Sequence, residues 1–313
     1  MPGPTWREAS ARRIERALHL AQAKGTGGWH VVGASTDIGS QRTVTRSIAG
    51  REVVLWRDDA GSLVAGPGAC PHLGALLQDC PVRAGVAYCR WHGLPLRAGG
   101  GPGWQPWAAH DDGVLAWVRI PAEGEAVTDA PSLAVRPPSQ ESIAAVVSHR
   151  ARCEPRDIIA NRLDPWHGAW FHPYAFSHLT VDAAASTDEL LVVEVAYRVT
   201  PRFAVPVVAE FACPDARTIV MTITDGEGAG SVVETHATAL GIDAEGHPVT
   251  VMTEVSMATS ERPGFAAVRA LAPLVRRGMR HAASRLWVDD LAYAERLYEL
   301  RARGEDPGGT PSA

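Results

Sequence analysis

Two cysteine–histidine pairs in the first third of the chain constrain its fold more than any other feature. The segment CPHLGALL begins at Cys70 and the segment CRWHG begins at Cys89, so the pattern is C-x-H…C-x-x-H with 16 residues between His72 and Cys89. Each half offers one thiolate and one imidazole from a tight loop. Thiolate ligands favour zinc or iron–sulfur centres, so the pattern predicts that the two loops share a metal centre.

Two kinds of centre fit these residues. A tetrahedral zinc site could use all four. A two-iron, two-sulfide cluster could instead divide them, with the cysteines on one iron and the histidines on the other, which raises the potential to about −150 to +300 mV from about −400 mV. The surroundings favour the cluster, because Gly74 and Gly93 follow the histidines and let the backbone approach it closely.

The sequence around these pairs predicts a small all-β domain. Short β-branched runs such as WHVVGA, EVVLWRD and SLVAG are separated by Gly or Asp turns. Over roughly residues 28–118 the chain resembles the Rieske domain of ring-hydroxylating and related oxygenases, although HGLPL replaces the common continuation of histidine, Gly, Trp, any residue and Phe. The resemblance implies a [2Fe-2S] Rieske cluster held by Cys70, His72, Cys89 and His92.

A second cluster of metal-ligand residue types lies in NRLDPWHGAWFH, residues 161–172. In an ideal helix His167 and His172 are turned about 140° apart, so a kink near Gly168 is needed to aim both rings at one point. Asp164 precedes His167 by about one turn. The alternative is that Asp164 caps a helix that starts at Pro165, with two ordinary histidines.

Beside a Rieske domain, this spacing resembles the iron-site signature of Rieske non-haem iron oxygenases. The resemblance implies a mononuclear Fe(II) bound by His167 and His172, with a carboxylate from elsewhere. The segment RLWVDDLAYAERLYEL resembles the family's acidic pair, which implies Asp290 as the third ligand. Asp289 is the alternative ligand, and both could instead belong to a charged helix face.

The same family resemblance implies how electrons arrive. A reductase dependent on NAD(P)H, often with a ferredoxin, passes them to the cluster, and they reach the iron of the neighbouring subunit in a homotrimer. Asp164 is the implied bridge, since one carboxylate can accept N–H groups from histidines of both sites. Asn161 is expected to position this bridge or the pocket, and His178 is expected to be structural.

The chain is long enough for one large or two unequal domains. We expect an α+β protein, in which an all-β Rieske domain precedes a helix-grip catalytic domain with a curved antiparallel sheet plus helices. Helices are expected near 5–24, 154–172, 264–278 and 280–302. The expected divisions are an N-terminal helical extension at 1–27, the Rieske domain at 28–120, a Pro-, Ala- and Ser-rich linker at 121–140, the catalytic domain at 141–302 and a disordered tail at 303–313.

Composition limits the environment. The net charge is −5 and no Lys/Arg block occurs, so no nucleic-acid partner is expected. No apolar run approaches the ~20 residues that span a bilayer, and the N-terminus has no signal-peptide pattern, so a cytoplasmic location is expected. The odd, sparse set of five cysteines argues against a disulfide framework. Cys80 is expected to be a small buried apolar residue.

These features predict the terminal oxygenase of a Rieske system. It would hydroxylate, O-demethylate or otherwise oxidise an apolar small molecule in bacterial natural-product biosynthesis or catabolism, and it looks most like the monooxygenase and O-demethylase branch. Phe203, Phe211, Val255 and Trp287 are candidates for the pocket, although they suit a core equally well. The alternatives are a Rieske electron carrier with a docking domain and no mononuclear iron, and a zinc-stabilised binding module.

Overall fold

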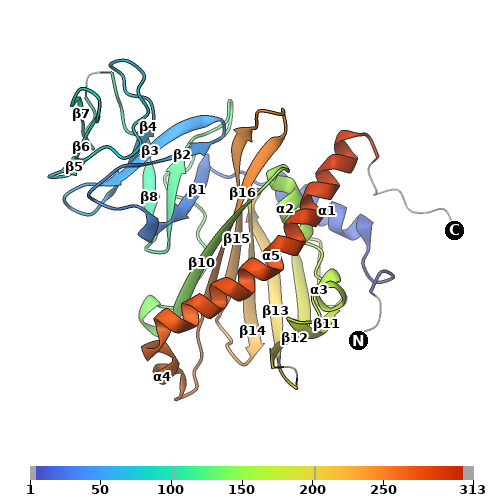
Figure 1. Cartoon of the computed structure of the whole chain (residues 1–313). Helices are drawn as coiled ribbons and strands as arrows, with labels where there is room; N and C mark the ends of the chain where they lie inside the picture. Colours follow the sequence, from blue (N-terminus) through green and yellow to red (C-terminus); the bar gives the residue numbers. More distant parts are fainter. Residues whose placement is uncertain (1–4, 102, 201, 306–313) are drawn as a thin grey trace. The chain divides into compact units, whose positions relative to one another are not determined.

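The computed structural model describes residues 5–101, 103–200 and 202–305, and its elements are labelled in Figure 1. The chain divides into two compact units. The first consists of residues 25–132 with 238–251, and the second of residues up to 24, 133–237 and from 252 onward. The first is an all-β unit and the second combines a large sheet with helices, so the expected α+β class is confirmed.

The all-β unit is built from short strands. They form three three-stranded sheets with the orders β1-β9-β8, β2-β3-β4 and β5-β6-β7. Their bounds are β1 Trp29–Ala34, β2 Val44–Ile48, β3 Arg51–Arg57, β4 Leu63–Pro67, β5 Val82–Arg83, β6 Val86–Tyr88, β7 Pro95–Leu96, β8 Ala109–Asp111 and β9 Leu115–Arg119, with a 3-10 turn η1 at Ser35–Asp37.

The β3 strand explains why this unit is stable despite its short elements. Four consecutive residues of β3, from Val53 to Trp56, are fully buried. Alternate side chains of a strand point to opposite faces, so β3 packs on both of its faces. One of its faces meets Trp104, whose ring centroid is 5.5 Å from that of Trp56. The buried cysteines of the two ligand loops belong to the same apolar cluster as these tryptophans.

The second unit is organised around a seven-stranded sheet with the order β10-β16-β15-β14-β13-β12-β11. Strands β11 to β15 pair antiparallel with their neighbours in this order. The strand bounds are β10 Ile143–Ala151, β11 Phe176–Val181, β12 Leu190–Thr200, β13 Phe203–Asp215, β14 Thr218–Gly226, β15 Val232–Ile242 and β16 Pro248–Ala258.

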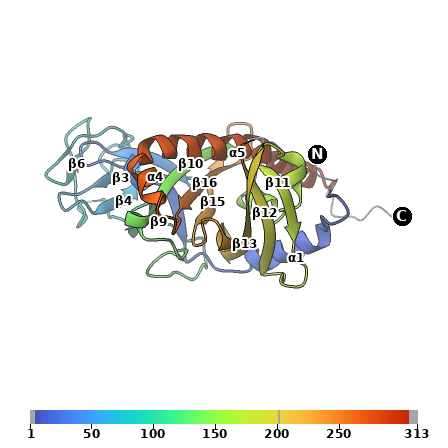
Figure 2. The same cartoon turned by 90° about the horizontal axis from the view of Figure 1, so that it is seen from below.

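Helices accompany this sheet. Their bounds are α1 Ala11–Gln22, α2 Pro155–Arg162, α3 His167–Phe171, α4 Phe265–Ala270 and α5 Ala272–Ala302, with a 3-10 turn η2 at Ser139–Glu141. Figure 1 shows α5 crossing the strands diagonally, and Figure 2 shows it along one side of the sheet. The buried residues between α2, α5 and the sheet form one continuous apolar core.

The helix expected over residues 154–172 is interrupted in the structure. Pro155 begins α2, and Glu154 and Asp157 form a reciprocal capping box there. The helix then ends at Arg162, and a turn at Pro165 separates it from α3. Proline has no backbone N–H to continue a helix and restricts the residue before it, so the two helices can point in different directions.

Other elements of the structure also differ from the prediction. The N-terminal helix is shorter than expected, and strands β10 and β11 were not anticipated. The break expected at 279 was wrong, because α5 runs through Gly278 without interruption. A glycine inside a helix costs about 1 kcal/mol, and the packing of α5 in the core offsets this cost. Of the expected disordered tail, residues 306–313 lie outside the described residues.

Within the part of the chain that the structure describes, no helix has the length and apolar character needed to cross a bilayer.

Candidate metal centres

The two cysteine–histidine loops begin where two short strands end. Cys89 follows β6 directly, and Cys70 comes three residues after β4. In each loop a glycine amide donates a hydrogen bond back to the cysteine carbonyl, from Gly74 to Cys70 at 2.8 Å and from Gly93 to Cys89 at 2.7 Å. Both glycines have φ of +74°, which side chains other than glycine rarely adopt. The loops are therefore tight turns of similar shape.

The four expected cluster ligands differ in exposure. Cys70 and Cys89 are buried, with 4% and 2% of their surface exposed, whereas His72 and His92 are exposed. The imidazole ring centroids are 4.9 Å apart and the rings are nearly perpendicular. Burial raises the pKa of the Cys70 thiol, and the neighbouring Cys89 adds to the effect. The sulfur atoms thus face the core of the unit and the imidazoles face outward.

This arrangement fits a dinuclear cluster better than a single zinc ion. One tetrahedral ion needs all its ligand atoms close together, since zinc–ligand bonds are only about 2.0–2.3 Å. Among the described residues, just one group of three has ligand atoms all within 4.8 Å of one another, and it lies elsewhere. Cys80 is fully buried and its thiol is free, as expected for a small core residue.

The second motif converges because α3 ends before its last histidine. His167 is the first residue of α3, and His172 follows the helix with φ −115° and ψ 55°, outside the helical region. Its amide still donates a hydrogen bond to the carbonyl of Gly168 at 2.9 Å. The two imidazoles are therefore not held at the 140° separation of an ideal helix, and their ring centroids are 5.4 Å apart.

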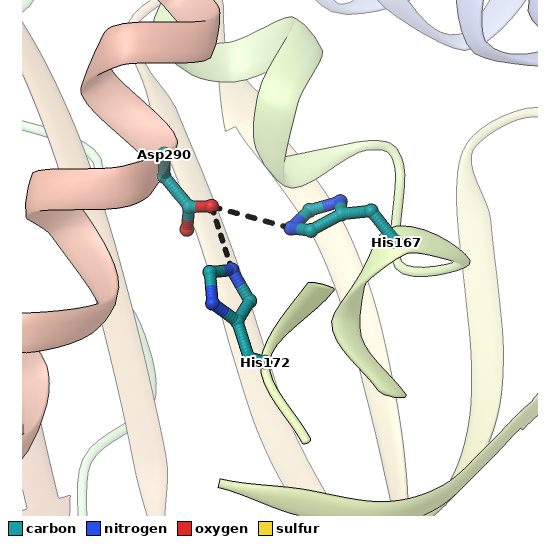
Figure 3. A group of neighbouring side chains, drawn as sticks. All are labelled: His167, His172 and Asp290. Carbon is teal, nitrogen blue, oxygen red and sulfur yellow. Dashed lines mark hydrogen bonds and ion pairs between the residues drawn. The ribbon is translucent and has the colours of Figure 1, made fainter. Parts of the chain in front are cut away.

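Asp290 of α5 faces both of these histidines, as Figure 3 shows. Its Oδ1 atom lies 2.9 Å from Nε2 of His172 and 3.4 Å from Nε2 of His167. Asp290 and His172 are buried. These three side chains form the group whose ligand atoms all lie within 4.8 Å. The alternative residue, Asp289, turns away from this point, and 43% of its side chain is exposed.

Asp289 instead takes part in holding His172. The Tyr174 hydroxyl donates a hydrogen bond to Asp289 Oδ2 at 3.1 Å and lies 3.2 Å from Nδ1 of His172. Burial, together with the bond to Asp289, raises the pKa of Tyr174 to about 12, so the hydroxyl keeps its proton. The tyrosine oxygen can then only accept from His172, which places the imidazole proton on Nδ1 and leaves a lone pair on Nε2.

The donor set therefore suits a cation. The Nε2 lone pair of His172 and the carboxylate oxygen of Asp290 are two acceptors that face each other at 2.9 Å, and only a proton or a metal ion between them removes the repulsion. Burial disfavours a charged His167, but the nearby carboxylates of Asp164 and Asp290 outweigh it and raise the pKa of His167 to about 9. The pKa of Asp290 lies far below its usual range because the two histidines outweigh its burial.

Two further residues of the motif carry unsatisfied atoms. Oδ2 of Asp164 lies 3.6 Å from Nδ1 of His167. Its other oxygen, Oδ1, is buried and has no hydrogen-bond partner in the described ranges of the chain, as is also true of Oδ1 of Asn161. A buried acceptor without a donor costs about 1–3 kcal/mol, so these two atoms mark positions where a donor is missing from the isolated chain.

The three facing side chains open onto a cavity of about 700 Å³ with a mainly apolar lining. Of the four apolar residues expected to line a pocket, Phe211 and Trp287 do so. Val255 takes the alternative place in the core, where it is fully buried, whereas Phe203 is in neither place, since 60% of its surface is exposed. His178 is exposed on β11, where it contacts Thr180, and does not line the cavity.

Sequence reasoning missed three polar residues of this cavity. Tyr174 lies only two residues after His172, so its position could have been noticed. Arg162 lies inside the motif, between Asn161 and the first histidine, and was passed over as ordinary. Glu254 is the one carboxylate of β16, PVTVMTEVSMA, and it lines the cavity although it is buried. A single acid within an apolar strand was the available signal.

Comparison with protein families gives two matches. The model described as Domain of unknown function (DUF5914) matches residues 122–305. The Rieske [2Fe-2S] domain model matches residues 28–111, which confirms the expected Rieske domain. One curated relative, the oxidoreductase NdmD of Pseudomonas putida, is 29% identical over 73 residues. The match covers 23% of this chain and 12% of NdmD, so the chain corresponds to only about an eighth of that relative.

Solved structures share the fold across both units. Dicamba monooxygenase bound to dicamba superposes with a TM-score of 0.66 and 16% identity, covering 92% of each chain. The terminal oxygenase of carbazole 1,9a-dioxygenase from Nocardioides aromaticivorans IC177 gives 0.61 and 14%, covering 96% of this chain and 91% of that one. A reduced complex between oxygenase and ferredoxin in carbazole 1,9a-dioxygenase gives 0.59 and 12%, covering 98% and 88%. The expected fold is therefore confirmed.

Proposed function

We propose a function from the premise that the chain belongs to the family described as domain of unknown function DUF5914 and carries a Rieske [2Fe-2S] domain before it. The protein is then the terminal oxygenase of a Rieske system. It uses dioxygen and electrons from an NAD(P)H-dependent reductase, a ferredoxin or both to oxidise an apolar small molecule. Hydroxylation and O-demethylation are the expected reactions, in the monooxygenase branch, on a substrate of bacterial natural-product biosynthesis or catabolism.

The observation that carries this proposal is the convergence of three ligands inside a cavity. His167, His172 and Asp290 are the ligand types of a two-histidine, one-carboxylate site, and all of them border the cavity. An electron carrier has no need for such a site. The size of the cavity, about 700 Å³, lies in the range of small-molecule sites.

The protein's own residues would prepare this site in three ways. The hydroxyl of Tyr174 fixes the His172 tautomer that leaves Nε2 free to bind metal. The apolar lining that includes Phe211 and Trp287 excludes water around the reacting group. His167, His172 and Asp290 would hold a ferrous ion, which would supply the chemistry of dioxygen reduction.

Asp164 is proposed as the bridge for electrons from the cluster. Its Oδ2 faces His167, and its buried Oδ1 has no donor among the residues that the structure describes. An exposed cluster histidine, His72 or His92, of a neighbouring subunit would supply the missing N–H group. This role is the reason for proposing a homotrimer, in which head-to-tail contacts close into a ring. We also propose that the protein acts in the cytoplasm.

Iron counting tests the proposal directly. Anaerobically reconstituted protein is expected to hold about three irons per chain, two in the cluster and one in the mononuclear site. The ferrous site is also expected to bind nitric oxide, with an electron paramagnetic resonance (EPR) signal distinct from that of the reduced cluster. His167→Ala is expected to lose one iron and the nitric oxide signal. His178→Ala, which removes an exposed histidine from β11, is the matched control and keeps both.

The rival electron carrier predicts a different result. It would hold two irons per chain and show no nitric oxide signal, although its cluster would still accept electrons from a surrogate reductase. Oxygen uptake that depends on both the reductase and an added apolar compound supports the oxygenase. A count of two irons in fully reconstituted protein would reject the mononuclear site, and with it the proposed function.

A further inference from the structure

The cavity contains a cation that the proposed oxygenase chemistry does not use. Arg162 is the last residue of α2, and it lines the same cavity as His167 and Asp290. Its Nε atom is buried and has no hydrogen-bond partner. Within the described ranges, its guanidinium forms no hydrogen bond and no ion pair within 4.0 Å. An arginine with unsatisfied donors in an apolar cavity is costly unless a ligand completes it.

Three other charged groups at the cavity are either paired or exposed. Arg198 donates a hydrogen bond from Nε to the carbonyl of Pro173 at 3.0 Å. Glu227 pairs with Arg262 and accepts a hydrogen bond from Ser260. Arg285 is exposed and lies 3.8 Å from the ring centroid of Tyr174. Arg162 differs from Arg198 and Glu227 because its contacts among the described residues are aromatic, and it differs from the exposed Arg285 because its Nε is buried without a hydrogen-bond partner.

Two aromatic rings fix the position of this guanidinium. Its central carbon lies 5.6 Å from the ring centroid of Phe211 and 5.9 Å from that of Trp287, within the distance at which a cation is attracted to a ring face. Trp287 is itself held, since its indole N–H donates to Glu254 Oε2 at 2.7 Å. Contact with ring faces leaves the hydrogen-bond donors at the edge of the guanidinium plane available.

Glu254 does not satisfy the hydrogen-bond donors of Arg162. The two residues form no ion pair, and one carboxylate oxygen of Glu254 is occupied by Trp287. Burial raises the pKa of Glu254 and outweighs the opposing effect of Arg162, which weakens the glutamate as a counter-charge. The donors of Arg162 therefore remain available for a group that enters the cavity.

We propose that Arg162 binds a carboxylate of the substrate, so that the substrate class is an apolar carboxylic acid. This inference rests on the proposed function, because it takes the cavity at His167, His172 and Asp290 as the substrate site. A guanidinium and a carboxylate match in a planar, two-bonded geometry. The apolar lining then holds the hydrocarbon part of the acid, and the fixed carboxylate determines which of its carbons approaches the metal site.

Matched pairs of acids and neutral amides test this assignment. The probes are 1-naphthoate, cyclohexanecarboxylate and dodecanoate, each with its primary carboxamide, titrated calorimetrically into the reconstituted protein. At least one acid is expected to bind roughly ten- to a hundredfold more tightly than its amide, the size of a hydrogen bond to a charged group. In Arg162→Met the acid is expected to lose this advantage and bind about as its amide does. Arg162→Lys is expected to keep part of it, since the charge remains without the planar pair of donors.

Arg296→Met is the matched control, because it removes an exposed guanidinium of α5 that pairs with Glu299. It is expected to leave the preference for the acid unchanged. The assignment is overturned if none of the three acids binds more tightly than its amide, or if the preference for the acid survives in Arg162→Met. Iron content and the nitric oxide signal are measured on the same samples, so a chain with three irons and no acid preference refutes the substrate class alone. A chain with two irons refutes the proposed function.

Discussion

The two candidate metal regions of this protein are built in opposite ways. The proposed cluster ligands come from two similar tight turns close together in the sequence, with cysteines buried and histidines exposed. The mononuclear site joins His172 to Asp290, which lie 118 residues apart, and buries both. A centre that exchanges electrons benefits from ligands at the surface, whereas a centre that binds oxygen and substrate benefits from an enclosed cavity. The comparison implies that each centre can be lost without the other.

Substituting one ligand at either centre is expected to have the largest effect on iron content and oxygen uptake. His172→Ala should leave two of three irons and a normal EPR signal from the reduced cluster. Cys89→Ser should remove the cluster and leave the ferrous site able to bind nitric oxide. Both variants should reduce substrate-dependent oxygen uptake to background, because neither centre completes the reaction alone. Iron analysis and EPR spectroscopy on the same preparations check the result.

Loss of both centres in either variant would contradict the separation of the two regions. Circular dichroism of each variant distinguishes this outcome from general misfolding. Retention of three irons by His172→Ala would instead show that the third iron lies elsewhere.

The difference between the regions also explains how much the sequence could predict. All four cluster ligands lie in two short loops, so their spacing carries most of the information. The choice between Asp289 and Asp290 was different, because neighbours on a helix point about 100° apart and the packing of α5 decides which one faces the histidines. The resemblance of this segment to the family's acidic pair implied Asp290, but the local spacing alone did not decide between the two residues.

The same limit applies to the cavity and the helices. Val255 and Phe203 have the apolar character of lining residues, but one faces the core and the other is exposed. The helix expected near residues 154–172 begins close to the start of α2, but the sequence did not place the interruption between α2 and α3. The sequence also did not predict that α5 continues through Gly278, an exposed position where a glycine costs a helix only about 1 kcal/mol.

A buried charge network makes the free energy of unfolding of the catalytic unit dependent on pH. Glu234 is 1% exposed and contacts Arg136 and His236. Burial disfavours its charge, but these partners lower the pKa of Glu234 to about 2. A lowered carboxyl pKa stabilises the fold above about pH 4.5, and the stabilisation is lost as the pH falls towards 2. Glu234→Gln is expected to cost about 3 kcal/mol at pH 7 and to flatten the loss of stability in acid, measured by chemical denaturation.

Asp111 of the Rieske unit is the matched carboxylate for this test. It pairs with Arg57, but both side chains are more exposed than those of the Glu234 network. Partly exposed ion pairs contribute less because water screens them, so Asp111→Asn is expected to have the smaller effect. An equal or larger loss of unfolding free energy in Asp111→Asn would show that burial does not determine how much each carboxylate stabilises its unit.

The link between the two centres is tested by Asp164→Asn. The substitution preserves the shape of the side chain but removes the charge that would orient one histidine from each centre. Turnover is expected to fall about 10- to 100-fold, while iron content and the signals of both centres stay normal. Asp188→Asn, which alters an exposed carboxylate paired with Arg16, should leave turnover unchanged. Normal turnover in Asp164→Asn would exclude the bridging role.

The smallest effect is expected from Tyr174→Phe, which removes the hydroxyl between His172 and Asp289. Nδ1 of His172 lies 3.8 Å from Asp289 Oδ2, so a small movement lets the two bond directly and limits the loss. We expect the affinity for Fe(II) to fall about tenfold, near the low end for an outer partner of a ligand, with an unchanged cluster signal. Metal competition titrations measure it, and Tyr298→Phe, on the same α5 helix but outside the cavity lining, is the control. If the affinity stays unchanged, the hydroxyl does not set the tautomer of His172. A parallel loss of the cluster would mean that the two centres are coupled through the fold, and not only through electron transfer.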